Sequence, residues 1–134
     1  GPRFSGQGSW RAVVPRTRRN STIFMGKTTK AGLNPVSETE SYLFTLDKRE
    51  NMDFIPPEQW PALLAGLLAE FGGAAGDVRE GLLSGTITQH RIVYRPLAGH
   101  MINAPWHRGR VVLLHFFTRA CGNCGTQTCT SGCA

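Results

Sequence analysis

The sequence predicts an α+β domain, with an antiparallel or mixed β-sheet covered on one face by one or two helices. Strand-like patterns occur in the first third of the chain and return after residue 86, whereas helical periodicity appears only between them. Strands and helices do not alternate, so a parallel α/β sheet is not expected. Sixteen glycines and eight prolines in 134 residues indicate short elements joined by many loops.

The first three strands are expected before residue 50. Residues 10–15 (W-R-A-V-V-P) form a short apolar run that ends at a proline, and residues 22–25 begin a second strand. Residues 27–33 carry polar and β-branched side chains towards an Asn-Pro turn. Residues 40–46 alternate with the period of two that is typical of a half-covered strand. One set of alternate positions in this last strand holds Tyr42, Phe44 and Leu46.

A helix is expected between residues 53 and 73. Pro56-Pro57-Glu58 is typical of a helix start, and Gly72-Gly73 of a helix end. Apolar residues recur between them at spacings of three and four, at Trp60, Leu63, Leu64, Leu67, Leu68 and Phe71. A shorter helix is expected over residues 74–83, and further strands over 86–97 and 110–114. We expect the helix to form a core with Val13, Phe44, Leu46, Ile92 and Val112.

The formal net charge is +6, and the excess lies in the first thirty residues and between residues 91 and 110. Nucleic-acid binding is not favoured, because the basic residues lack interleaved aromatic residues and a recognisable nucleic-acid-binding motif. The alternatives are that they border a site for an anionic aromatic molecule or lie against a partner domain. No apolar run approaches the roughly 20 residues that span a bilayer, so we expect a cytoplasmic protein without membrane contact.

Four segments together resemble a known enzyme family. They are W-R-A-V-V-P at 10–15, K-A-G-L-N-P-V-S-E-T-E-S-Y-L-F at 30–44, Y-R-P-L at 94–97 and P-W-H-R-G-R-V-V-L-L at 105–114. In this order they are similar to the middle domain of FAD-dependent aromatic monooxygenases, the group of salicylate and para-hydroxybenzoate hydroxylases. Such enzymes continue with Gly-Asp-Ala-x-His, which holds the flavin, whereas this chain continues with His115-Phe116-Phe117. The chain also lacks a G-x-G-x-x-G motif after a strand.

The resemblance implies a substrate-binding-like α+β domain over residues 9–114, preceded by a flexible N-terminus over residues 1–8. It implies that FAD and NAD(P)H serve the parent family but that this chain alone binds neither. No catalytic residue is expected, because the flavin carries out the hydroxylation in that family. The residues that match the pocket strands are Phe24, Met25, Leu33, Pro35 and Tyr42. Tyr42 would donate a hydrogen bond to an aromatic carboxylate-type ligand, although residues of these types also occur in sheet cores.

The tail over residues 115–134 does not match the family. It holds four thiols in the pattern C-x2-C-x4-C-x3-C, at Cys121, Cys124, Cys129 and Cys133. Four cysteines can bind zinc tetrahedrally, but structural zinc sites usually place their two ligand pairs farther apart. We favour a non-homologous ending that arose from a frameshift, a gene-cassette junction or a fusion. A redox or disulfide role is the third alternative.

These observations predict an isolated or truncated substrate-binding domain of a flavin-dependent aromatic hydroxylase without autonomous catalysis. One alternative is a stand-alone binding or assembly module, in which the face that would meet the flavin domain is covered by homodimer formation. The other is a small zinc-binding protein that uses the cysteine-rich tail.

Overall fold

The computed structural model describes residues 2–100, 103–105 and 107–112. The chain divides into two compact units, and the larger one is Phe4–Leu97. The smaller unit contains a short hairpin formed by β6 (His107–Arg108) and β7 (Val111–Val112). All the features that bear on the candidate site lie in the larger unit.

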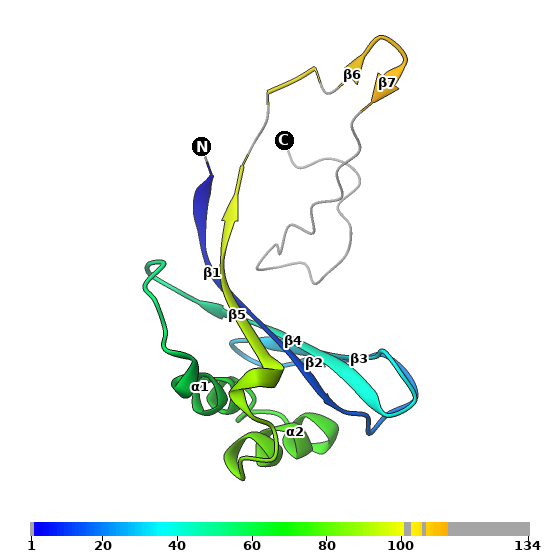
Figure 1. Cartoon of the computed structure of the whole chain (residues 1–134), viewed down its shortest axis with the longest axis vertical. Coiled ribbons are helices and arrows are strands. Elements are labelled where there is room, and N and C mark those ends of the chain that lie inside the picture. The colour runs from blue at the N-terminus through cyan, green and yellow to red at the C-terminus, as the bar shows by residue number, and fades with distance from the viewer. Residues whose placement is uncertain (1, 101–102, 106, 113–134) are drawn as a thin grey trace. The chain divides into compact units, whose positions relative to one another are not determined.

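Five strands form one antiparallel sheet in the order β2-β3-β4-β1-β5 (Figure 1). The first strand therefore lies inside the sheet, between the fourth and the fifth. The register places Gly32 opposite Phe44, and Phe44 opposite Arg11. The strands are β1 (Arg3–Pro15), β2 (Thr22–Met25), β3 (Lys30–Pro35), β4 (Glu40–Lys48) and β5 (Ile92–Gly99).

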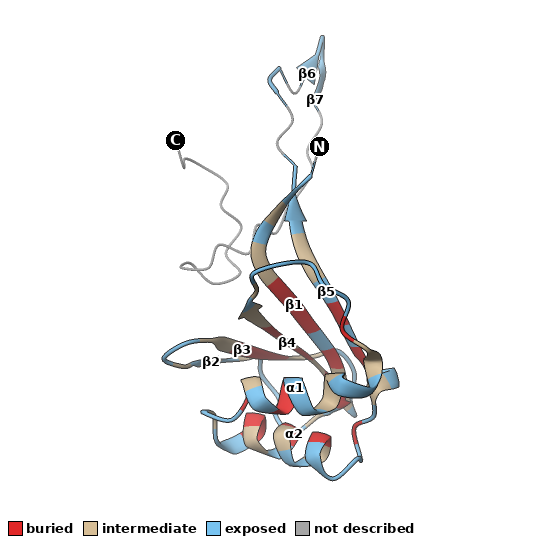
Figure 2. Ribbon diagram, turned by 90° about the vertical axis from the view of Figure 1, so that its left-hand side faces the viewer, coloured by how far each residue is buried: buried red, intermediate tan, exposed pale blue. Residues whose placement is uncertain are grey.

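Two α-helices, α1 (Trp60–Leu67) and α2 (Gly73–Leu83), lie on the same face of this sheet (Figure 2). The short 3-10 helix η1 (Pro57–Gln59) leads into α1, and η2 (Gln89–Arg91) leads into β5. The proline-rich start was expected from the sequence, but α1 ends at Leu67, before Gly72-Gly73, and Gly73 begins α2 instead of ending the first helix. One face of the sheet is therefore covered by helices, and within the described residues no helix covers the other face (Figure 2).

The hydrophobic core lies between the helices and the sheet. Alternate residues of each central strand are buried in it, as the two-residue period of a strand requires. From the sheet it includes Trp10, Ala12, Val14, Ala31, Leu33, Leu43, Ile92 and Tyr94, and from the helices Leu64, Ala65, Leu68, Ala74, Val78 and Leu82.

The predicted core was right for Leu64, Leu68 and Ile92, but Leu63 on the helix is 38% exposed and four residues of the strands also lie outside the core. Val13, Phe44 and Leu46 lie on the opposite face of the sheet, and Val112 is exposed in the smaller unit. The cause is that β4 carries apolar residues on both faces, so alternation alone does not indicate which face meets the helices.

The α+β fold is confirmed, with an antiparallel sheet and two helices on one face. Several element boundaries differ from the prediction. The first strand begins at Arg3, so residues 3–8 belong to it, and β5 begins at Ile92 because residues 89–91 form a 3-10 turn. Among the described residues, no helix has both the length and the apolar character to cross a membrane.

Candidate functional site

The sheet face opposite the helices is the most distinctive surface of the larger unit. We call it the open face. Its apolar side chains are unusually accessible, since Met25 is 75% exposed, Ile23 50% and Val93 46%. It is formed by Arg11, Val13, Ile23, Met25, Tyr42, Phe44, Leu46 and Val93.

The centre of the open face is a closely packed apolar group around Gly32. A side-chain carbon placed on Gly32 would collide with the ring of Phe44 and would lie 3.0 Å from Cδ1 of Ile23. Both side chains therefore lean over this glycine. The rings of Tyr42 and Phe44 are 6.3 Å apart between centroids, with their planes at 32°. The result is a nearly flat patch of aromatic and aliphatic carbon.

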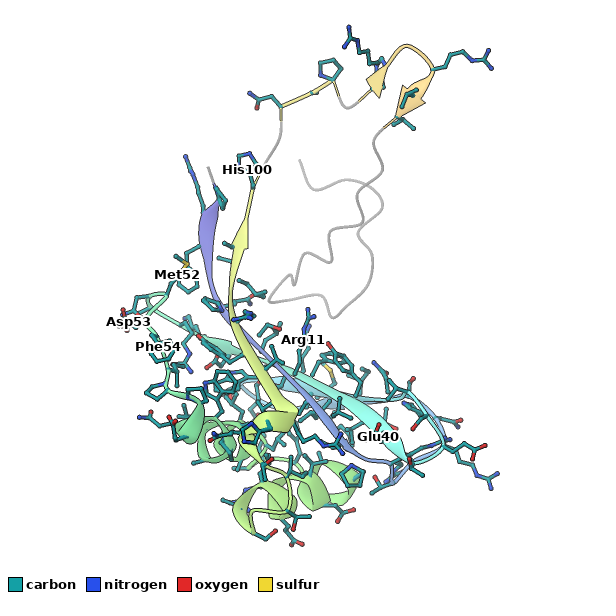
Figure 3. The ribbon with its side chains drawn as sticks, in the orientation of Figure 1. Arg11, Glu40, Met52, Asp53, Phe54 and His100 are labelled. Carbon is teal, nitrogen blue, oxygen red and sulfur yellow. The ribbon has the colours of Figure 1, made fainter. Side chains whose placement is uncertain are left out.

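A positive charge borders this patch. Arg11 is exposed, lies beside Phe44 in the register and extends away from the helices (Figure 3). No carboxylate in the described part of the chain forms an ion pair with Arg11. Glu40, at the start of β4, is instead paired with Arg91 at 2.9 Å between Oε1 and Nη1. The open face thus combines an apolar floor with a cation that is available to an anionic ligand.

Of the five residues predicted to bind a substrate, Tyr42 and Met25 lie on the open face. Leu33 is only 3% exposed and lies in the core beneath the helices. Phe24 packs against the same core, with its ring 6.0 Å from that of Phe71. Pro35 pairs with Ser41, which also places it on the helix side. The five residues therefore do not share one surface.

The prediction missed Phe44, Ile23 and Arg11. The sequence contained a signal for each of them, because residues two apart on a strand share a face. Phe44 follows Tyr42 by two, and Ile23 precedes Met25 by two. Phe24, in contrast, adjoins Met25 and must point to the other face. The alternation of side chains along a strand would have separated Ile23 and Met25 from Phe24. It could not have indicated which of these two faces packs against the helices.

The open face is a surface rather than an enclosed pocket. Two hollows lie elsewhere in the larger unit, and no residue predicted to bind substrate lines either of them. The larger, of about 390 Å³, lies between the end of β1 and α2, and the smaller, of about 320 Å³, lies at the loop of Arg16 to Arg19. A ligand on the open face would need a second surface to enclose it.

A group of polar and aromatic residues on the helix side supports the fold. The rings of Trp10 and Tyr94 are 4.5 Å apart, and the guanidinium carbon of Arg49 lies 5.3 Å from the Tyr94 ring. Arg49 also approaches Asp47, at 2.7 Å between Nε and Oδ2. Burial raises the pKa of the Tyr94 phenol, and the charge of Arg49 partly opposes this rise. These contacts join β1, β4 and β5.

No metal site is found in the described residues, which contain no group of three or more histidine, cysteine, aspartate or glutamate side chains that could hold an ion. The predicted zinc ligands, Cys121, Cys124, Cys129 and Cys133, lie outside the described residues.

The larger unit lacks the arrangement that usually binds a dinucleotide. FAD-binding folds use a strand, a glycine-rich turn and a helix whose N-terminus meets the pyrophosphate. In the larger unit the strands are antiparallel, and no strand leads directly into a helix through such a turn.

Solved structures of FAD-dependent monooxygenases have a similar fold. A variant of Klebsiella pneumoniae HpxO complexed with FAD matches 85% of this chain and 30% of its own, with a TM-score of 0.66 and 18% sequence identity. Klebsiella pneumoniae HpxO complexed with FAD and uric acid matches 73% of this chain and 25% of its own, with a TM-score of 0.59 and 16% identity. The tetracycline destructase Tet(51) matches 85% and 31%, with a TM-score of 0.57 and 12% identity.

The chain thus has the fold of a single domain of these flavin monooxygenases and spans about 30% of the length of the HpxO variant. At these identities the likeness concerns the fold. No protein-family model matches the sequence, and a comparison with curated proteins found no match.

Proposed function

We propose that the Phe4–Leu97 unit is the substrate-binding domain of a flavin-dependent aromatic hydroxylase, and that its open face covers the ring of an aromatic carboxylate. One observation carries the proposal. An apolar floor formed by Phe44, Ile23 and Tyr42 around Gly32 lies beside Arg11, which no described carboxylate neutralises. The resemblance to FAD-dependent monooxygenase structures supports the same role.

The chemistry of the face suits such a ligand. An arginine guanidinium binds a carboxylate through two parallel hydrogen bonds, which fixes the orientation of the acid as well as its position. Aromatic rings pack favourably in offset or tilted arrangements, as Tyr42 and Phe44 already do with each other. The Tyr42 hydroxyl can donate a hydrogen bond to a carboxylate or a phenolate. The role of these side chains is to bind and orient the substrate.

Hydroxylation itself requires the flavin, which supplies the oxygen-transfer chemistry when it is bound. The larger unit lacks the strand, glycine-rich turn and helix that usually bind FAD, so we propose that protein outside the described residues holds the flavin. The 134-residue chain alone is therefore expected to bind aromatic acids without hydroxylating them. Its purified form is expected to be colourless and not to oxidise NADH. Location in the cytoplasm stays a prediction.

Calorimetric titration with salicylate and a hydroxynicotinate tests the proposal, with salicylamide as the uncharged control. We expect the acids to bind with dissociation constants below about 1 mM, and the amide more weakly. Arg11→Gln should weaken acid binding by about tenfold or more, as expected for the loss of a charge-assisted hydrogen bond. Arg19→Gln is the matched control, since it removes an exposed arginine that is not part of the open face. Failure of both acids to bind below millimolar concentration would overturn the proposal.

A further inference from the structure

The loop between β4 and α1 has an unusual exposed tip. Residues 50–54 (E-N-M-D-F), here called the acidic tip, contain two carboxylates and two apolar side chains. Phe54 is 81% exposed and Met52 is 56% exposed. Phenylalanine is seldom so accessible in a folded unit, and exposed apolar groups that lie close together often mark a contact site.

The acidic tip is held at both ends. Before it, the backbone N–H of Arg49 donates a hydrogen bond to the carbonyl of Gly6 at 2.9 Å. After it, Ile55 is buried, and its carbonyl accepts a hydrogen bond from Trp60 Nε1 at 3.0 Å. Within it, Asn51 Oδ1 accepts a hydrogen bond from the Asp53 N–H at 3.1 Å. Phe54 is therefore displayed from a fixed loop.

The acidic tip matches the open face in chemistry. Asp53 and Phe54 present a carboxylate and a phenyl ring on adjacent residues, and these are the two groups of an aromatic acid. The open face offers Arg11 and the apolar floor around Gly32. Figure 3 labels Arg11 and, from the tip, Met52, Asp53 and Phe54, all of which belong to the larger unit. Since Phe54 is 81% exposed, its ring is not packed on the open face of its own chain.

We propose that the acidic tip of one copy of the chain docks on the open face of a second copy. Phe54 lies there against Phe44 and Ile23, and Asp53 forms an ion pair with Arg11. A two-fold arrangement makes this contact twice, because each copy supplies one tip and one open face. The self-association is argued from the described open face alone, whereas a second part of the proposal, that self-association competes with aromatic acids, rests on the proposed function.

The dimer is expected to be weak. Two short loops on two open faces bury less surface than the roughly 1,200 to 2,000 Å² of a stable interface, which indicates a dissociation constant in the micromolar range or above. Sedimentation velocity from about 10 to about 500 μM chain should then show a reversible rise from monomer to dimer, since this range brackets such a constant.

Charge exchange tests the pairing directly. Asp53→Arg alone and Arg11→Asp alone should each weaken the dimer by about tenfold or more, and the double variant should recover most of the loss. Phe54→Ser should also weaken the dimer by about tenfold or more, because it removes the ring that becomes buried when the dimer forms. Leu83→Ser is the matched control, since Leu83 is 58% exposed on α2 and lies away from both surfaces. This variant should associate as the unaltered chain does.

Two results would overturn the proposal. One is a chain that stays monomeric over the whole concentration range. The other is a dimer weakened by Arg11→Asp but not by Asp53→Arg or Phe54→Ser, which would show that two open faces pack directly on each other.

Sedimentation velocity repeated with added salicylate distinguishes this proposal from the proposed function. If both hold, saturating salicylate returns the dimer to monomer. If the dimer responds to the charge exchange but salicylate neither binds nor dissociates it, the self-association stands and the proposed function fails. If salicylate binds but does not dissociate a dimer that otherwise behaves as expected, the proposed competition between the acidic tip and aromatic acids for the open face is wrong.

Discussion

At the scale of single residues, Gly32 determines the form of the open face. Its missing side chain leaves the space that the ring of Phe44 and the Cδ1 atom of Ile23 occupy. Any larger residue in the middle of β3 would push these two side chains away from the sheet and make the floor uneven. A small residue at the centre of a strand is thus needed here for packing.

We expect Gly32→Ala to destabilise the protein by about 1 to 3 kcal/mol, the usual cost of forcing an extra carbon into a packed position. Urea unfolding followed by tryptophan fluorescence measures the change. Gly66→Ala is the control, because nothing lies within 4 Å of the added carbon and Gly66 is within α1. Its replacement should instead stabilise by about 0.5 to 1 kcal/mol. Equal stability of Gly32→Ala and the unaltered chain would contradict the packing described for Phe44.

At the scale of elements, Glu70 joins the end of the α1 segment to the turn between β2 and β3. Its carboxylate accepts hydrogen bonds from the backbone N–H of Lys27 at 2.8 Å and from Thr28 Oγ1 at 3.4 Å. Gly26 leaves room for this approach, since a side chain there would collide with the carboxylate. The hydrogen bond from the Lys27 backbone is the main cause that lowers the pKa of Glu70 below its ordinary value of 4.5.

This link predicts a dependence of stability on pH. A carboxylate whose pKa is lowered by folding stabilises the folded state above the unfolded pKa, and the effect is lost as the pH falls through the folded pKa. The unaltered chain should therefore be more stable than Glu70→Gln at pH 7, and the difference should shrink as the pH falls below 4.5. Thermal unfolding between about pH 7 and about pH 3 measures it. Glu58→Gln, which replaces an exposed glutamate at η1, is the control at pH 7, where it should lower the unfolding temperature less than Glu70→Gln does.

At the scale of the whole molecule, the described buried residues of the Phe4–Leu97 unit form one hydrophobic core that runs from Trp10 to Tyr94. Zinc binding by Cys121, Cys124, Cys129 and Cys133 stays a prediction, as does the favoured alternative of a non-homologous ending.

We expect that removing residues 115–134 leaves the thermal unfolding of the Phe4–Leu97 unit unchanged, because the buried residues described in this unit already form a continuous core between its sheet and its helices. Elemental analysis of the full chain should find less than one zinc per molecule. The opposite finding, one zinc per chain whose removal by a chelator lowers the unfolding temperature, would show that the cysteines form a structural site.

Much of the fold followed from local patterns. The spacing of Leu64 and Leu68 predicted the buried face of α1, and the alternation in β4 predicted a strand with two distinct faces. The candidate site followed only in part. Tyr42 and Met25 were placed among the ligand-binding residues and lie on the open face, whereas Leu33 lies in the core. Whether Tyr42 binds a ligand stays a prediction.

The sequence by itself determined the order of the strands and helices and which residues share a side of each strand, because these depend on neighbours within a few positions. Only the tertiary structure decided which side of the sheet the helices cover. Residues 42–46 offer an aromatic set on one side and Leu43 on the other, so local periodicity leaves both choices open. Packing against Leu64 and Leu68 buried the side with Leu43 and left Arg11, Tyr42 and Phe44 together on the open face.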